Sequence, residues 1–252
     1  MSSPTLPTIL LVPGAWHSPA SYDLLRSDLH DRGFPTETVT LAGVGNTDVN
    51  VGLEQDTAAV RVKLETLVNA GGEVVVVAHS YGGVPVANAV EGFNYKDRLA
   101  QKKAGGVLMS IYMTAFALSA GAALSDGAGL PSWWNVTDGL ISPLNQIQTF
   151  YADVEPSLAA KAVEALRPQP FKTFQDKSGF EPWNNGFEMG YIFAEQDQAI
   201  PLDLQKLMAS QFPAESFTAS LPASHSPFLS MPKALGGVLQ EAAQVAVAKK
   251  SV

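Results

Sequence analysis

Residues 74–90 read VVVVAHSYGGVPVANAV, a run of valines followed by His79, Ser80, Tyr81 and a glycine pair. Continuous apolar residues of this kind are typical of a parallel strand that helices cover on both faces. The run after Gly83 is helix-like. Ser80 therefore lies between the carboxyl end of a buried strand and the next helix, which is where open α/β sheets bind ligands.

The same alternation extends along the chain. Beside the run at residues 73–78, predicted strands lie at residues 8–12, 36–41, 105–113, 190–194 and 215–221. Predicted helices lie at residues 19–32, 54–70, 82–91, 201–211 and 231–249. Strands that alternate with helices predict an α/β fold with a mostly parallel sheet of about six strands, flanked by helices.

Residues 115–188 interrupt this rhythm, because they carry short helix-like pieces and many aromatic residues but no clear strand. A stretch of this length between two strands is expected to be a helical cap insertion over the carboxyl edge of the sheet. Its aromatic residues either line a site or hold the insertion together. We expect one domain, residues 1–252, that contains this insertion.

Composition excludes several classes of partner. The chain has 16 basic and 24 acidic residues, a net charge of −8, and no basic cluster of the kind that binds nucleic acid. No signal-peptide start and no apolar run of roughly 18 residues is present, so we expect a cytoplasmic protein without a membrane partner. The chain has no cysteine, and no His or carboxylate cluster has metal-ligand spacing, so no metal or other cofactor is expected.

The residues around Ser80 approach the nucleophile elbow, G-x-S-x-G, in which small residues allow a strained turn to pack closely on neighbouring strands. Here the pattern is Ala78-His79-Ser80-Tyr81-Gly82, with alanine in the first small position. The alternative is a serine that only caps a helix. A nucleophilic serine would need a base, an acid that orients the base, and donors for an oxyanion.

The chain has four histidines, and in this motif the acid and the histidine follow the nucleophile in that order. His17 and His30 precede Ser80, and the side chain of His79 should point away from it. His225, after the last predicted strand, is the remaining candidate for the base. Asp197 and Glu195 both follow the preceding strand as candidate acids, and spacing alone does not choose between them.

Two backbone N–H groups would complete the site. One is that of Tyr81, directly after the nucleophile, and the other is that of Ala15, in the loop after the first strand, where Gly14 permits an unusual backbone conformation. His17 beside this loop either points into the pocket or caps a turn. Further expected pocket residues are Met113, Trp134 and Trp183.

Four stretches together resemble the α/β-hydrolase superfamily, in the compact branch of plant methyl esterases, hydroxynitrile lyases and small microbial esterases. They are PGAWHSPASYDLL, AHSYGG, GYIFAEQDQAIPLDLQKLM and SHSPFLSMP, and the resemblance covers nearly the whole chain. It implies the α/β-hydrolase fold and a triad of Ser80, His225 and Asp197, since relatives carry the acid four residues before the proline. The usual His-Gly of the first loop is Pro13-Gly14 here.

The resemblance also separates activities. Hydroxynitrile lyases of this branch carry lysine after the catalytic histidine, whereas this chain has Ser226, and epoxide hydrolases and dehalogenases carry aspartate where Ser80 stands. We therefore expect a carboxylic ester hydrolase that acts on an ester or lactone of an apolar or aromatic small molecule. Two alternatives are a non-hydrolytic reaction in which His225 acts as a general base, and a non-catalytic small-molecule receptor.

Overall fold

The computed structural model describes residues 6–127 and 130–250 and is built on a six-stranded parallel sheet. Its order is β2-β1-β3-β4-β8-β9, and every neighbouring pair is parallel. The strands are β1 (Thr8–Val12), β2 (Thr36–Thr38), β3 (Glu73–His79), β4 (Gly106–Met113), β8 (Met189–Ala194) and β9 (Phe217–Leu221). The predicted α/β fold class and all six sheet strands are thus confirmed.

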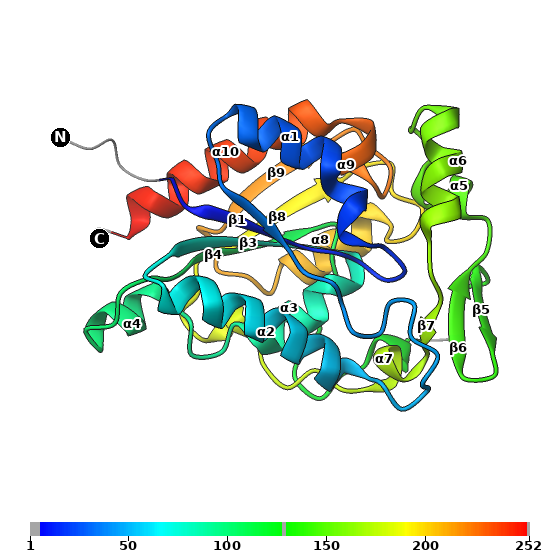
Figure 1. The fold of residues 1–252 in the computed structure, drawn as a ribbon, viewed down its shortest axis with the longest axis horizontal. Coiled ribbons are helices and arrows are strands. Elements are labelled where there is room, and N and C mark those ends of the chain that lie inside the picture. Colours follow the sequence, from blue (N-terminus) through cyan, green and yellow to red (C-terminus); the bar gives the residue numbers. More distant parts are fainter. Residues whose placement is uncertain (1–5, 128–129, 251–252) are drawn as a thin grey trace.

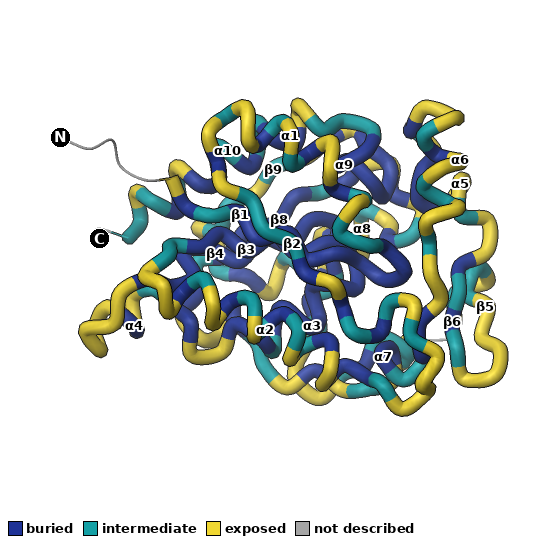
Figure 2. The backbone as a smooth tube through the Cα atoms, viewed as in Figure 1, coloured by how far each residue is buried: buried dark blue, intermediate teal, exposed yellow. Residues whose placement is uncertain are grey.

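Helices cover both faces of this sheet (Figure 1). One face carries α1 (Asp23–Asp31) and α10 (Pro232–Lys249), and the other carries α2 (Leu53–Asn69), α3 (Gly83–Ala89) and α4 (Tyr95–Ala100). Shorter elements are η1 (Pro19–Tyr22), η2 (Ser80–Gly82), α8 (Leu202–Ala209) and α9 (Pro227–Ser230). The four valines of β3 are at most 1% exposed, as burial on both faces requires. Figure 2 shows this buried centre surrounded by exposed outer turns.

Much of the chain between β4 and β8 lies beyond one end of the sheet (Figure 1). Its elements are η3 (Leu124–Asp126), β5 (Trp134–Thr137), β6 (Leu140–Pro143), α5 (Gln146–Phe150), α6 (Pro156–Ala165), β7 (Gln169–Pro170), α7 (Lys172–Gln175) and η4 (Pro182–Asn184). We call residues 115–188 the β4–β8 segment.

The expectation that this segment is helical was wrong in part, because β5, β6 and β7 form a small antiparallel sheet. Thr137 pairs with Leu140 across a two-residue turn in which Asp138 and Gly139 both have positive φ. An Asp-Gly pair is a strong hairpin signal, and it is present in the sequence. The strands it joins have only four residues each, which is too short to stand out as periodic runs.

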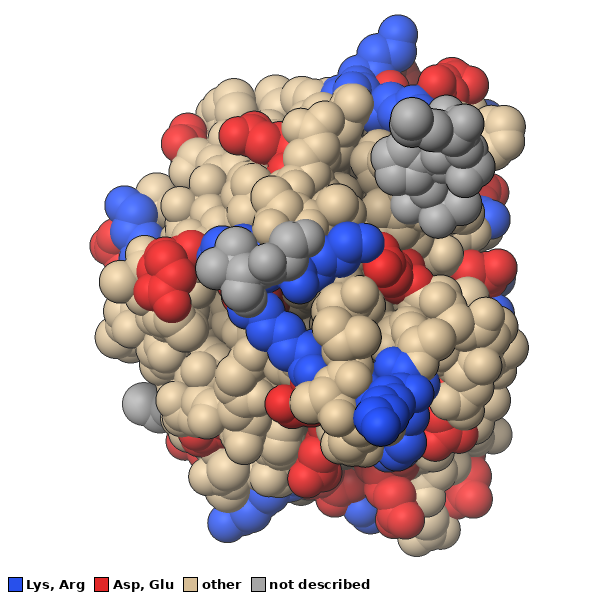
Figure 3. Space-filling view, turned by 90° about the vertical axis from the view of Figure 1, so that its left-hand side faces the viewer, with Lys and Arg blue, Asp and Glu red and all other residues tan. Residues whose placement is uncertain are grey.

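Charged side chains of both signs lie together on the face that carries the two chain ends (Figure 3). Lys96 and Lys249 both pair with Glu188, at 3.1 and 2.8 Å, and Lys250 pairs with Glu73 at 2.9 Å. These basic groups are therefore neutralised locally. Within the described residues, no helix has the length and hydropathy needed to cross a bilayer.

Candidate active site

Ser80 lies at the turn from β3 into η2 and α3, with its backbone in the left-handed region at a φ of +53°. A non-glycine residue in this region costs on the order of 1–3 kcal/mol and persists only where the surroundings enforce it. Gly82 and Gly83 allow the close packing that holds this conformation. A Cβ at either position would collide with a backbone carbonyl, that of Pro13 or of Phe116. The turn therefore closes against the loops after β1 and β4.

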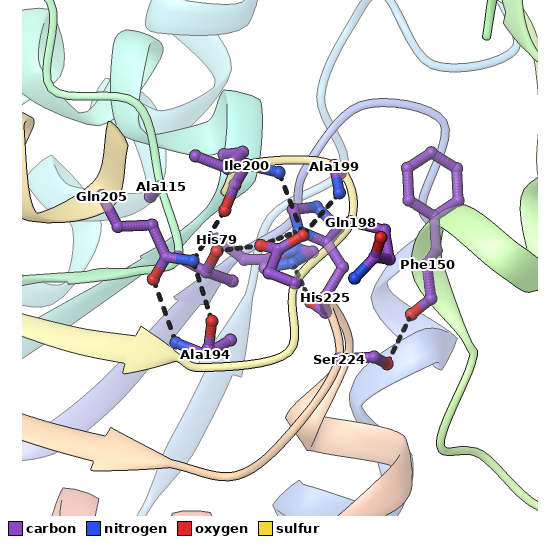
Figure 4. Close-up of polar contacts among 12 residues, drawn as sticks. His79, Ala115, Phe150, Ala194, Gln198, Ala199, Ile200, Gln205, Ser224 and His225 are labelled. Carbon is purple, nitrogen blue, oxygen red and sulfur yellow. Dashed lines mark hydrogen bonds and ion pairs between the residues drawn. The ribbon is translucent and has the colours of Figure 1, made fainter. Parts of the chain in front are cut away.

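His225 and Asp197 are brought together by the loops that follow β9 and β8. His225 Nδ1 lies 2.7 Å from Asp197 Oδ2, and both side chains are buried. The other carboxylate oxygen, Oδ1, accepts the N–H groups of Ala199 at 2.7 Å and Ile200 at 3.0 Å (Figure 4). These donors fix the carboxylate, whose other oxygen faces the Nδ1 of the histidine. Glu195, the rival acid, is exposed.

Thr114, directly after β4, was not anticipated from the sequence. Its hydroxyl donates to Asp197 Oδ2, the oxygen that also faces His225. The residue is fully buried and has a positive φ of 37°, so its backbone is strained where it reaches the acid. The signal for it was positional, because parallel strands bring their carboxyl ends to one edge of the sheet.

His79 occupies the space between the elbow and the loop of His225. Its Nε2–H donates to the carbonyl of His225 at 2.9 Å, so its Nδ1 accepts the hydroxyl of Tyr22 at 3.0 Å. The rings of His79 and His225 lie 4.7 Å apart. Burial, with the nearby His225 and His17, holds the pKa of His79 well below its usual range, so it is a neutral support for the loop.

No hydrogen bond joins the hydroxyl of Ser80 to His225 in the described part of the chain. Catalytic hydrogen bonds are often long without substrate and shorten only in the complex. The Nε2 of His225 is the nitrogen that does not face Asp197, and the loop contact with His79 places that ring beside the residue that precedes Ser80. The His225 ring therefore lies next to His79, the residue before the elbow serine.

A narrow pocket beside Ser80 has a cavity volume of about 10 Å³. Its lining residues are Ala15, Trp16, Ser80, Tyr81, Phe116, Leu124, Trp133, Trp134, Phe174, Ala199 and Ile200. None of these is Asp, Glu, Lys, Arg or His. An apolar wall of this kind disfavours charged ligand groups, which would lose their hydration without gaining a partner.

Of the expected pocket residues Met113, Trp134 and Trp183, one lines the pocket and two do not. Trp134 lines the pocket, whereas Met113 is buried within β4 and Trp183 packs on Tyr112 and Phe212 away from it. Aromatic density indicated the β4–β8 segment as a source of lining, but it could not show which rings face Ser80.

His17 also lies outside the lining. Its Nδ1–H donates to the carbonyl of Ala15 at 2.7 Å, and its Nε2 accepts the hydroxyl of Tyr151 at 2.8 Å. Burial is the main cause that lowers the pKa of His17 to about 4. His17 is therefore neutral at pH 7. Its two hydrogen bonds fix the loop after β1.

Ala15 and Tyr81 both line the pocket beside Ser80, and their backbone N–H groups are the expected oxyanion donors. Neither donates to a protein acceptor within residues 6–127 and 130–250. Their hydrogens are therefore available to an oxygen that develops charge near Ser80.

The ring of Tyr81 packs on Phe174, and its hydroxyl donates to Asp56 Oδ2 at 2.7 Å. Asp56 lies on α2, is fully buried, and accepts the N–H of Gly43 at 2.7 Å through its other oxygen. Burial raises the pKa of this carboxyl, and the two hydrogen bonds oppose that rise. A buried polar pair therefore anchors the residue that follows Ser80.

No group of three or more His, Asp or Glu side chains that could hold a metal ion occurs in the part of the chain that the structure describes.

The model of the family described as "Alpha/beta hydrolase family" matches residues 9–236. The sequence is 28% identical to "Alpha/beta hydrolase nvfD" of Aspergillus novofumigatus, over 96% of this chain and 98% of that protein. It is 29% identical to "Putative methylesterase 11, chloroplastic" of Arabidopsis thaliana, over 93% of this chain and 62% of that protein. The fold resembles a solved pyrethroid hydrolase from Sphingobium faniae, with a TM-score of 0.72, 23% identity, and coverage of 95% and 98% of the two chains.

Proposed function

The chain belongs to the alpha/beta hydrolase family, and we propose that it is a serine hydrolase that cleaves a carboxylic ester or lactone of an uncharged apolar or aromatic small molecule. The observation that carries the proposal is the buried His225–Asp197 pair beside a serine on a strained elbow that opens into an apolar pocket. In this proposal the β4–β8 segment is the cap that supplies most of the aromatic pocket wall. The methylesterase and hydrolase names of the relatives favour the same class of reaction.

The first half-reaction transfers the acyl group to the enzyme. His225 Nε2 takes the proton of Ser80 as Oγ bonds to the substrate carbonyl carbon, and the carbonyl oxygen becomes an oxyanion. The N–H groups of Ala15 and Tyr81 donate to that oxyanion. The tetrahedral carbon then expels the alcohol oxygen, which takes the proton from His225.

The second half-reaction repeats these roles with water. His225 removes a proton from water, whose oxygen attacks the acyl carbon, and the bond to Ser80 Oγ breaks as Oγ recovers the proton. Asp197 stays ionised throughout and stabilises the imidazolium that forms twice. The acid is released and the free serine is restored.

A fluorophosphonate probe and a panel of activated esters test this proposal directly. Wild type should be labelled and should hydrolyse uncharged aryl esters, whereas Ser80→Ala should lose both properties. An ester that carries a free carboxylate should be a poorer substrate than its uncharged analogue. Wild type that neither labels nor hydrolyses any ester would contradict the proposal, and tight binding of an unconsumed ligand would favour a receptor.

Activity on a natural substrate that survives Ser80→Ala but not His225→Ala would favour base catalysis without an acyl-enzyme. The two variants together therefore separate the nucleophile role from the base role. Each should be compared with wild type at equal folded fraction.

A further inference from the structure

The peptide between Ala15 and Trp16 is hydrogen-bonded at both ends. Its carbonyl accepts the Nδ1–H of His17 at 2.7 Å, and its N–H donates to Gln169 Oε1 at 3.0 Å. Because a peptide unit is planar, fixing its oxygen and its hydrogen fixes the orientation of the whole plane. Trp16 is held at a φ of +66°, a region that non-glycine residues rarely adopt.

This peptide adjoins the backbone N–H of Ala15, the donor that the proposed function assigns to the oxyanion. The φ and ψ torsions of Ala15 are the two rotations between that N–H and the clamped plane. Fixing the Ala15–Trp16 plane therefore restricts ψ of Ala15 and, with it, the backbone conformation of the loop whose Gly14 packs against the Cβ of Ser80. The direction of the Ala15 N–H therefore depends on His17 and Gln169, which hold the next peptide.

Gln169 is suited to holding the Trp16 N–H in one place. It lies in β7 of the β4–β8 segment, is fully buried, and has both ends of its amide satisfied. Its Nε2 donates at 2.7 Å to the hydroxyl oxygen of Thr173, whose own hydrogen goes to the carbonyl of Pro170 at 2.8 Å. Both ends of the amide are thereby paired, and Oε1 faces Trp16 because the Trp16 N–H can only donate.

Two further contacts from the same segment hold Trp16. Its indole N–H donates to the carbonyl of Ile141 at 3.0 Å, and its carbonyl accepts the N–H of Arg167 at 3.1 Å. The clamp on the other side, His17, is itself oriented by Tyr151, which occupies Nε2 and leaves the proton on Nδ1. The β4–β8 segment thus reaches both ends of the clamped peptide.

We infer that Gln169 and His17 are positioning residues that aim the Ala15 N–H at the reaction oxyanion; this inference rests on the proposed function. The β4–β8 segment consequently takes part in transition-state stabilisation as well as in lining the pocket. Its contribution belongs to kcat, because the oxyanion exists only after attack on the carbonyl.

Gln169→Leu and Thr173→Val form a matched pair on this network. Gln169→Leu removes the acceptor of the Trp16 N–H, whereas Thr173→Val removes the partner of the other end of the amide and leaves the clamp. Loss of a whole oxyanion donor costs about 100- to 1000-fold in kcat, so a misaimed one should cost about tenfold or more, with KM within about twofold. Thr173→Val should lower Tm by a similar amount but keep kcat within about twofold of wild type.

His17→Asn and His17→Leu give the corresponding pair on the other side. The amide nitrogen of asparagine can replace Nδ1 as donor to the Ala15 carbonyl, whereas leucine cannot. His17→Asn should therefore retain more kcat than His17→Leu. Hydrogen exchange of the Trp16 amide, which needs no substrate, should accelerate in Gln169→Leu and not in Thr173→Val.

An active wild type whose kcat is matched by Gln169→Leu would overturn the inference and leave the proposed function standing. Equal losses of kcat in Gln169→Leu and Thr173→Val would also overturn it, because they would show a general loss of packing. A wild type without ester turnover would contradict the proposed function and, with it, the inference.

Discussion

The hydroxyl of Thr114 donates to Asp197 Oδ2, the same oxygen that faces His225 Nδ1. The acid of the candidate triad is therefore held from three elements at once: the end of β4, the loop after β8, and the loop after β9. Each contact restricts the carboxylate to one orientation. The orientation of the His225 ring then depends on residues that do not touch substrate.

Thr114→Val should reduce kcat by roughly five- to thirtyfold, because it removes one hydrogen bond of about 1–2 kcal/mol from the acid while keeping a β-branched side chain. Steady-state kinetics on an activated ester measures the loss. Thr114→Ser keeps the hydroxyl and should recover most of the rate. A Ser variant no better than the Val variant would show that packing, not the hydrogen bond, matters at this position.

Asp153 of the β4–β8 segment should support the position of His225. Its carboxylate accepts the Ser224 N–H at 3.0 Å and also the Ser224 hydroxyl, which lies 3.2 Å from the carbonyl of Phe150 (Figure 4). We expect Asp153→Ala to lower kcat by about fivefold, since Ser224 directly precedes the histidine. The kcat values of Asp153→Ala, Ser224→Ala and the double variant measure the coupling between these two residues.

Glu155→Ala is the matched control for that change. Glu155 is a carboxylate of the same segment that caps α6 through the N–H groups of Ser157 and Leu158 and contacts neither catalytic loop. It should lower stability by about 1 kcal/mol and leave kcat unchanged. If the effects of Asp153→Ala and Ser224→Ala simply multiply, the proposed link through Ser224 is wrong.

The Tyr81–Asp56 hydrogen bond should contribute to stability more than to catalysis. Tyr81→Phe leaves the buried Asp56 carboxyl with one donor fewer, at a cost of about 1–3 kcal/mol in the free energy of unfolding. Urea denaturation measures this cost. Because the oxyanion donor is the backbone N–H, kcat should stay within about threefold of wild type; a stable but inactive variant would assign the phenol itself to the reaction.

Buried His17 should make stability depend on pH. Its pKa is about 4 in the folded state and 6.5 when exposed, so below pH 6.5 the unfolded chain binds a proton that the folded chain excludes. The free energy of unfolding therefore falls as the pH drops, by about 2 kcal/mol between pH 7 and pH 5 from this residue alone. His79, whose pKa is also lowered, acts in the same direction.

Urea denaturation of wild type and His17→Asn at pH 7 and pH 5 tests this dependence. The variant lacks the titrating group, so the drop between the two pH values should be smaller by about 2 kcal/mol. Equal drops in the two proteins would show that His17 does not exclude its proton in the folded state.

The sequence by itself determined the sheet, the elbow and the order of the candidate triad. Continuous valines and helix-length spacing are local patterns, and the small residues around Ser80 follow from sterics within one turn. The distinction between His225 and the other histidines also needed only chain order. The strands and the elbow are each encoded by residues that are neighbours in the sequence. The triad order is encoded by the order of its residues along the chain.

Tertiary structure alone decided which of the remaining residues meet at the site. Gln169, Thr114 and Asp153 are separated from their partners by 71 to 153 residues, and only Thr114 has a sequence signal, its place directly after a strand. The same holds for the separation of Trp134, in the pocket, from Trp183, in the core. The physical reason is that buried polar groups and aromatic rings take their partners from whichever elements pack together, and that packing is a property of the whole fold.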